Sequence, residues 1–401
     1  MEKYQKYGMI LTPQNFIFEN INYLNDELWQ AFRNFYILCL TTKGLVEYFN
    51  RPLPDELINA SYKYFETIKN IPAGNTPDIG AMADFYFENY TPIWNLSNQR
   101  NKALLYEAFD ITRKWEKNNS FAIHKGTLFY FWATTDLIHG DYDEGIILMH
   151  KALDEDRRKS GGSRMPDTPA YNFVSMNEKP GAYLQPITQD MVDFIKRRLD
   201  KYKNEAAGQL QYQDLRSKFL DSKEQKFEDL KFYFCYTILK WRRLRKINKQ
   251  RNIADDQMAP LIITGLIADL LLIIDGILKI ALSSVYNKSK RGRKIYFSDH
   301  LFEIAKRKKW TNKNTFSEYQ NGIGVKINEE LNNDFANAIQ NFLNSKIGTQ
   351  KVTKLESDFW LCYGLRNYSA HTIASQKLLW VKFIDILQSV LNVFYLAIEN
   401  L

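Results

Sequence analysis

The stretch LIITGLIADLLLIIDGILKIAL, residues 261–282, is apolar along almost its whole length. It could be mistaken for a membrane span, but it contains Asp269, Asp275 and Lys279. Each of these charges would cost a few kcal/mol at the centre of a bilayer. We therefore predict a buried helix of a helical bundle and no membrane association.

A strongly helical C-terminal segment contains LRNYSAH, residues 365–371. Positions four apart share one face of a helix, so Asn367 and His371 are expected to lie side by side. Arg366 lies on a neighbouring face, and Gly364 just before it is a place where the backbone could kink and bring guanidinium and imidazole together. An arginine, an amide and an imidazole are the groups needed to cleave a phosphodiester without a metal.

The spacing Arg-Asn-x-x-x-His resembles the signature of the HEPN superfamily, whose ribonuclease members carry Arg-x4–6-His with a polar residue, often Asn, after the Arg. Residues 268–281 resemble the long buried helix of HEPN bundles, in which an Asp precedes an apolar, Lys-containing turn. The resemblance covers roughly residues 225–401. It implies a helical nuclease domain, and nucleases of this kind typically serve antiviral defence or toxin systems in microbes.

The motif residues Arg366, Asn367 and His371 support RNA cleavage by transesterification. His371 would act as general base toward the ribose 2′-OH or as general acid toward the leaving 5′-oxygen. Arg366 would stabilise the charge on the phosphate in the transition state, and Asn367 would orient imidazole or phosphate. This route needs an acid and a base on opposite sides of the phosphate, and no second His in the C-terminal domain is spaced for the other role. We therefore predict a homodimer with the site across its two-fold axis.

Positive charge is concentrated in the same part of the chain. Between Lys240 and Lys313 there are 18 Lys and Arg against six Asp and Glu, a local excess of +12 in a chain whose total is +8. Such clusters bind a nucleic-acid backbone without reading its sequence. The predicted RNA-binding residues are Lys240, Arg242, Arg243, Arg245, Lys246, Lys290, Arg291, Arg293 and Lys294. The alternative is that these basic residues are only solvated.

The N-terminal half is nearly all helix by pattern, with Pro and Gly marking the breaks. Its clearest unit is Phe129–Asp156, where Gly140-Asp141-Tyr142 lies between two helical segments. This order resembles a tetratricopeptide-type helical hairpin and departs from that consensus at Gly145, where Ala is usual. We predict an irregular helical-repeat region that offers a surface to a protein partner or activator.

The predicted organisation is an all-α protein in two parts. Short extended pieces are expected only at 171–174 and 183–186, and helix resumes at Thr188 with this residue as N-cap. The composition changes near Lys226. The expected domains are a helical-repeat domain over 1–207, a connector over 208–224 and a HEPN-like nuclease domain over 225–401.

Signatures of other chemistries are absent from the sequence. There is no Gly-x4-Gly-Lys-Ser/Thr phosphate loop and no Gly-x-Ser-x-Gly elbow. No metal or cofactor is expected, because neither His-x3-His nor His-Glu-x-x-His spacing occurs. The remaining histidines are His124, His139, His150 and His300.

The cysteines and the N-terminus bear on the compartment. Cys39, Cys235 and Cys362 are scattered and outside any Cys-x-x-Cys spacing. Reduced thiols in a cytoplasm are the simplest interpretation. The polar start MEKYQK does not read as a signal peptide.

Two alternatives to a free-standing nuclease stay open. Some HEPN domains bind nucleotides or protein partners, and helical repeats are common adaptors, so Arg366 and His371 could be structural residues of a non-catalytic binding module. The other is a toxin partnered with a nucleotidyltransferase antitoxin. That variant usually carries Tyr two residues after the His, and Ile373 at this position argues against it.

Overall fold

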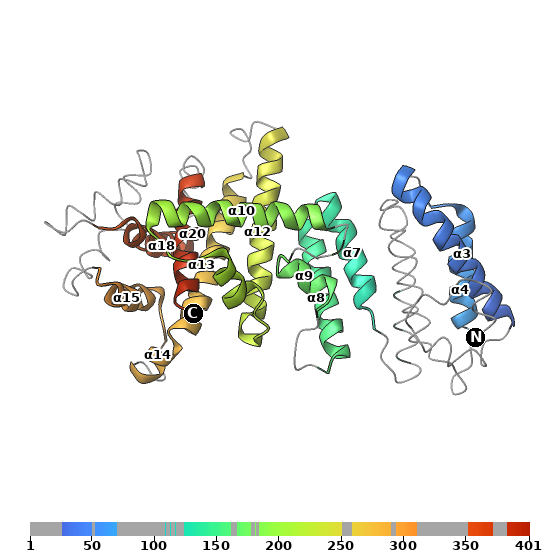
Figure 1. The fold of residues 1–401 in the computed structure, drawn as a ribbon, viewed down its shortest axis with the longest axis horizontal. Helices are drawn as coiled ribbons and strands as arrows, with labels where there is room; N and C mark the ends of the chain where they lie inside the picture. The colour runs from blue at the N-terminus through green and yellow to red at the C-terminus, as the bar shows by residue number, and fades with distance from the viewer. Residues whose placement is uncertain are drawn as a thin grey trace. The chain divides into compact units, whose positions relative to one another are not determined.

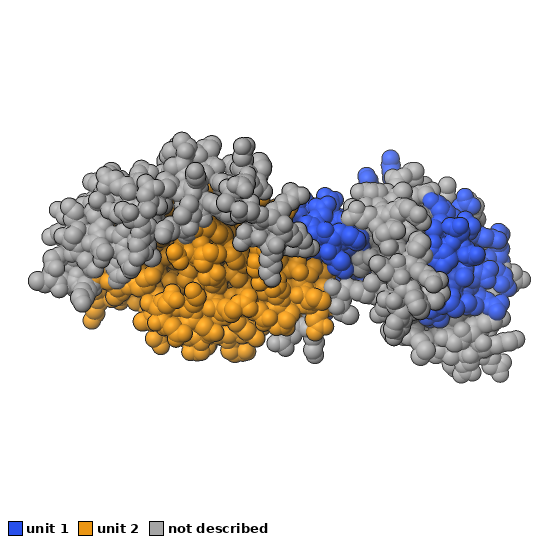
Figure 2. Space-filling model, turned by 90° about the horizontal axis from the view of Figure 1, so that it is seen from above, with its two compact units in different colours: residues 1–170 blue, residues 171–401 orange. Residues whose placement is uncertain are grey.

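The computed structural model describes residues 26–49, 53–69, 109, 113, 117, 124–161, 167–177, 181, 184–250, 259–289, 294–310, 352–371 and 383–401. Every regular element among these residues is a helix, which confirms the predicted all-α class. The chain forms two compact units, unit 1 over residues 1–170 and unit 2 over residues 171–401 (Figure 2).

In the described part of unit 1, two pairs of helices pack together, α3 with α4 and α7 with α8 (Figure 1). Their bounds are α3 Asp26–Phe49, α4 Asp55–Lys69, α7 Gly126–His139 and α8 Tyr142–Lys159. Between α3 and α4 the rings of Phe35 and Tyr64 stack with centroids 5.2 Å apart, and both side chains are fully buried. Each pair thus buries an apolar seam of its own.

The α7–α8 pair is the helical hairpin that the sequence predicted around residues 140–142. Gly140 ends α7 in the left-handed conformation with φ +91°, which a glycine adopts without strain. A Cβ atom on Gly145 would lie 2.8 Å from Leu137 Cγ, closer than packed carbon atoms approach. Gly145 therefore permits the close approach of α8 to Leu137.

Unit 2 is a helical bundle around α20 (Figure 1). Its elements are α10 Gln185–Ala206, α11 Tyr212–Leu215, a π-helical turn Arg216–Leu220, a 3-10 turn Gln225–Phe227, α12 Glu228–Gln250, α13 Ala259–Ala281, α14 Ser283–Ser289, α15 Phe297–Lys308, α18 Lys354–His371 and α20 Phe383–Glu399. A short helix, α9 Pro169–Val174, spans the boundary between the units.

Helix α20 is buried on all sides, since every residue from Ile386 to Ile398 is buried. It packs against α10, α13 and α18, and its buried polar residues Gln388 and Asn392 are hydrogen-bonded to each other and to α10 and α18. Its Phe394 ring stacks on Phe234 of α12 with centroids 4.4 Å apart. The bundle therefore has one continuous core, and α13 and α18 are fixed relative to each other through it.

The apolar stretch at 261–282 forms α13 and its last turn, and α13 contacts α12, α18 and α20. Ile263, Leu266, Leu270 and Ile274 are buried at helical spacing, so the predicted bundle helix is confirmed. None of the helices in the described part of the chain has a stretch long and apolar enough to cross a membrane.

Three local predictions around residues 171–188 were wrong. Residues 171–174, expected to be extended, belong to helix α9, and the extended piece expected at 183–186 is contradicted because Gln185 and Pro186 already lie in α10. Helix α10 begins at Gln185, three residues before the expected N-cap, because Pro186 fits the first helical turn, where no backbone N–H is needed. Helix α10 packs on α20 inside unit 2, while the domain limits at 207 and 225 stay a prediction.

Candidate functional site

Arg366, the first residue of the predicted catalytic set, is held between two other helices. Its Nη1 lies 2.9 Å from Oδ1 of Asp275, and its Nη2 donates a hydrogen bond to Oδ2 of the same residue at 3.3 Å. The guanidinium carbon also lies 5.2 Å from the centre of the Phe297 ring, within cation–π range. The side chain as a whole is 31 % exposed, although Nη1 itself is buried, and a forked ion pair and an aromatic ring fix the guanidinium.

Helix α13 supplies both Asp275 and Lys279, which share one face because they are four positions apart. Lys279 Nζ donates to Asp275 Oδ2 at 2.7 Å. Asp275 is almost buried, whereas Lys279 is 45 % exposed. The carboxylate therefore lies at the point where the apolar face of α13 meets the surface.

His300 completes the surroundings of Asp275, and sequence reasoning did not place it there. Its fully buried ring lies with Nε2 3.0 Å from Asp275 Oδ1 and Nδ1 2.6 Å from the Tyr286 hydroxyl. Helices α14 and α15 carry Tyr286 and His300. The only local signal in the sequence was that His300 lies on the apolar face of an amphipathic helix, which does not identify its partner.

The Asp275 carboxylate is saturated by these contacts. Its two oxygens are in contact with the polar nitrogens of Arg366, Lys279 and His300. A carboxylate has about four acceptor positions. Burial raises the pKa of Asp275, but hydrogen bonds from His300, Arg366 and Lys279 outweigh it and hold the pKa well below its usual range. Asp275 is therefore ionised at neutral pH and carries the charge that orients Arg366.

Helix α18 continues without a break through Gly364 to His371, so the backbone does not end one helix and begin another at Gly364. In a continuous helix Asn367 and His371 lie one turn apart, whereas Arg366 and His371 differ by roughly 140° around the axis. The side chains of Asn367 and His371 lie outside the described ones. The backbone thus gives Arg366 and His371 separate faces of one helix.

The predicted RNA-binding residues fall into several groups. Lys240 pairs with Asp269 at 2.7 Å, and both Arg242 and Arg245 pair with Asp190 of α10, at 3.0 and 2.6 Å. The Arg243 side chain is exposed on α12, and Lys294 is exposed beside the Tyr296 ring. The Lys246 side chain and residues Lys290, Arg291 and Arg293 lie outside the described part.

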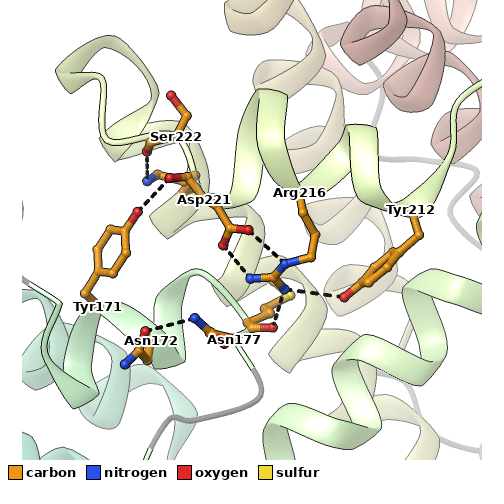
Figure 3. Close-up of polar contacts among 9 residues, drawn as sticks. Tyr171, Asn172, Asn177, Tyr212, Arg216, Asp221 and Ser222 are labelled. Atoms are coloured by element: carbon orange, nitrogen blue, oxygen red, sulfur yellow. Dashed lines mark hydrogen bonds and ion pairs between the residues drawn. The ribbon is translucent and has the colours of Figure 1, made fainter.

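A second polar cluster in unit 2 ties the segment after α9 to the turn before α12 (Figure 3). Arg216 makes a forked pair with Asp221 and donates to the Met176 carbonyl oxygen at 3.0 Å. Buried Lys231 donates to the Ser222 carbonyl oxygen at 2.5 Å. Burial lowers the pKa of Lys231 to about 8. These charged side chains pair with each other and with backbone carbonyl oxygens, as expected of a cluster that stabilises the fold.

Among the described residues, no group of three or more His, Cys, Asp or Glu side chains is arranged to hold a metal ion. No known protein family, curated protein or solved structure matches this chain.

Proposed function

We propose that unit 2 is a HEPN-like ribonuclease that cleaves RNA by attack of the ribose 2′-OH, without a metal. The observation that carries the proposal is the double clamp on Arg366, which Asp275 and Phe297 hold directly before Asn367 in the helix that ends at His371. A guanidinium fixed in this way, with part of its side chain exposed, is pre-organised to receive a phosphate.

In the proposed reaction the chain supplies all the reacting groups. His371 removes the proton from the 2′-OH or donates one to the 5′-oxygen that leaves. Arg366 stabilises the charge that develops on the phosphate, and Asn367 orients the imidazole or the phosphate. The products are a 2′,3′-cyclic phosphate and a 5′-hydroxyl, because the 2′-oxygen replaces the 5′-oxygen at phosphorus.

The separate faces of Arg366 and His371 on α18 favour a site shared by two chains. At a two-fold axis a surface meets its own copy, so each subunit can present its Arg366 toward its partner's motif. A homodimer therefore fits the proposal better than a monomer. Exposed basic residues such as Arg243 and Lys294 would attract the RNA backbone. Unit 1 would bind a protein partner or activator, and a role in cytoplasmic antiviral defence or as a toxin is part of this proposal.

One observation favours a second function, a non-catalytic binding module. The fork of Arg366 is occupied by Asp275, as in an ion pair that only joins helices α13 and α18. In that case the motif would stabilise the bundle, and unit 2 would recognise a nucleotide or a protein. The two functions differ in whether His371 is needed for any chemistry.

The deciding experiment incubates purified full-length protein with mixed RNAs, with and without EDTA. We expect cleavage that survives EDTA, leaves cyclic phosphate ends and disappears in His371→Ala. The matched control is His150→Ala, since His150 is a half-exposed histidine of unit 1. No cleavage by the wild type, or equal cleavage by wild type and His371→Ala, would reject the nuclease in favour of the binding module. Loss of cleavage with EDTA and recovery with magnesium would reject the metal-free route.

A further inference from the structure

Two buried residues outside the motif, Tyr286 and His300, begin a series of polar side-chain contacts that ends at Arg366. The Tyr286 hydroxyl lies 2.6 Å from His300 Nδ1, and His300 Nε2 lies 3.0 Å from Asp275 Oδ1. Asp275 in turn holds Arg366. Tyr286 is 3 % exposed and His300 is completely buried, so neither residue can touch an RNA substrate. Their hydrogen bonds reach Arg366 through Asp275. The His300 ring also packs edge-on against Phe297, the ring that lies against Arg366, with centroids 6.1 Å apart.

The charges around Asp275 decide the protonation of the His300 ring. Asp275 already has two cationic partners, Arg366 and Lys279. A third cation, fully buried beside them, would leave two positive charges without compensation and would be costly. The neutral ring has one donor and one acceptor nitrogen, and a Tyr hydroxyl can donate to the acceptor. The arrangement therefore favours a proton on Nε2, toward Asp275, and an acceptor Nδ1 facing Tyr286.

The other charged groups near Tyr286 and His300 do not change this placement of the protons. Helix α15 also carries Asp299, Glu303 and Arg307, and their charges act on the Tyr286 hydroxyl. Burial, followed by these two carboxylates and Asp275, raises the pKa of Tyr286 well above its ordinary value, whereas Arg307 lowers it. The hydroxyl thus keeps its proton at neutral pH and remains the donor to Nδ1.

We propose that His300 and Tyr286 are positioning residues that orient Arg366 through Asp275. The Nε2–H of His300 fixes the plane of the carboxylate, and that plane sets the direction of the Arg366 fork. Tyr286 selects the tautomer of His300. The inference deepens the proposed ribonuclease function and rests on it for its effect on catalysis, but the orientation of Arg366 can be measured without any reaction.

The test compares two amides that mimic different ring nitrogens. His300→Gln can place an N–H near the position of Nε2 and keep the donor to Asp275, whereas His300→Asn can reach only the position of Nδ1. We expect His300→Asn to lower kcat for RNA cleavage about 10- to 100-fold, because small displacements of a catalytic group have effects of this size. His300→Gln should stay within about threefold of the wild type, and KM should change little in either variant.

Tyr286→Phe removes only the hydroxyl and should give an intermediate loss of kcat. Equal kcat in His300→Asn and His300→Gln, both folded by circular dichroism and thermal melting, would overturn the inference. If His300→Asn does not fold, Tyr286→Phe with wild-type kcat would overturn it instead.

A second readout is independent of cleavage. In ¹⁵N spectra of the full chain, the His300 ring should show the neutral form with its proton on Nε2. The Arg366 guanidinium should show slowly rotating Nη groups in the wild type and in His300→Gln, and fast rotation in His300→Asn. If the spectra are as expected but the protein does not cleave RNA, the positioning role is supported and the nuclease proposal fails. A single proton on Nδ1 would overturn the inference whatever the activity, because Nε2 would then have no proton to donate to Asp275, and a doubly protonated ring would overturn the role of Tyr286 in selecting the tautomer.

Discussion

Arg366 and Asp275 are 91 residues apart in the sequence, yet Nη1 of one lies 2.9 Å from Oδ1 of the other. This ion pair joins α18 to α13 at the edge of the core. Because Asp275 is only 7 % exposed, its charge is largely removed from water and depends on its partners. The same contact therefore contributes to stability and to the geometry of the candidate site.

Asp275→Asn should destabilise the protein strongly. The change removes the charged acceptor of Arg366, Lys279 and His300, and because the two cations are part-exposed we expect a loss of about 2 kcal/mol, the usual worth of a hydrogen bond to a charged group. Urea unfolding at pH 7 measures this loss. The matched control is Asp269→Asn on the same helix, where the pair with Lys240 is part-exposed and worth under about 1 kcal/mol. Similar losses in both variants would contradict the role given to Asp275.

The pH dependence of this contribution follows from the lowered pKa of Asp275. A carboxyl group with a lowered folded pKa stabilises the folded state above its unfolded pKa of about 3.9 and loses this effect as the pH falls below that value. The stability difference between wild type and Asp275→Asn should therefore be constant from about pH 5 to about pH 7 and shrink in acid. Urea unfolding at several pH values tests this, and a difference that grows in acid would contradict it.

Glu356, near the start of α18, should act in the opposite direction. Burial raises the pKa of this carboxyl from 4.5 to about 7, although a hydrogen bond from Trp360 lowers it in part. A raised carboxyl pKa means that the folded state binds the extra proton, so stability falls as the pH rises from 4.5 to about 7. The full effect is roughly 3 kcal/mol, from about 1.4 kcal/mol per pKa unit.

Glu356→Gln should remove this slope and be more stable than the wild type at pH 8. Denaturant unfolding at a series of pH values measures both effects. The control is Glu205→Gln, since the Glu205 side chain is 48 % exposed. A slope that survives in Glu356→Gln would assign the titration to another group.

Two glycines of α13 give a paired test of packing. A Cβ on Gly265 would meet no atom within 4 Å, whereas a Cβ on Gly276 would lie 2.6 Å from Leu230 Cδ2 on α12. Gly265→Ala should stabilise the protein by about 0.5 to 1 kcal/mol, because Ala favours the helix. Gly276→Ala should be less stable than Gly265→Ala by about 1 kcal/mol or more, since Leu230 must shift. Equal thermal shifts for the two variants would show that α12 gives way without cost.

The proposed two-fold site predicts complementation between dead variants. Neither Arg366→Ala nor His371→Ala should cleave RNA alone. A mixture that exchanges subunits should regain partial activity, because a mixed dimer keeps one intact residue of each kind. Analytical ultracentrifugation of the wild type provides the control. A strict monomer whose cleavage rate is proportional to concentration at nanomolar levels would exclude a shared site.

The fold was predictable where local pattern decides it. Helical spacing and a Gly-containing turn indicated the α7–α8 hairpin, and three charges within an apolar stretch indicated a bundle helix at α13. Residues 171–174 were misassigned because aromatic and β-branched residues in a short run fit a strand as well as a buried helix. Burial among other helices then decides the outcome.

The candidate site was predictable only in part. Arg366 and its neighbours have a recognisable spacing, and Asp275 and Lys279 are four positions apart in one helix. The contact between His300 and Asp275 joins two helices through tertiary packing, which no local period encodes. For the same reason, the basic run gave no sign that Arg242 and Arg245 pair with Asp190 of another helix.

All three cysteines are buried, and burial raises the pKa of each thiol. A thiol that is both protonated and covered reacts with an alkylating reagent only when its surroundings open. Cys39 lies in α3 of unit 1, and Cys362 lies in α18 one turn before Arg366. The labelling rate of Cys39 therefore reports how often unit 1 opens. The labelling rate of Cys362 reports separately how often the helix that carries Arg366 opens.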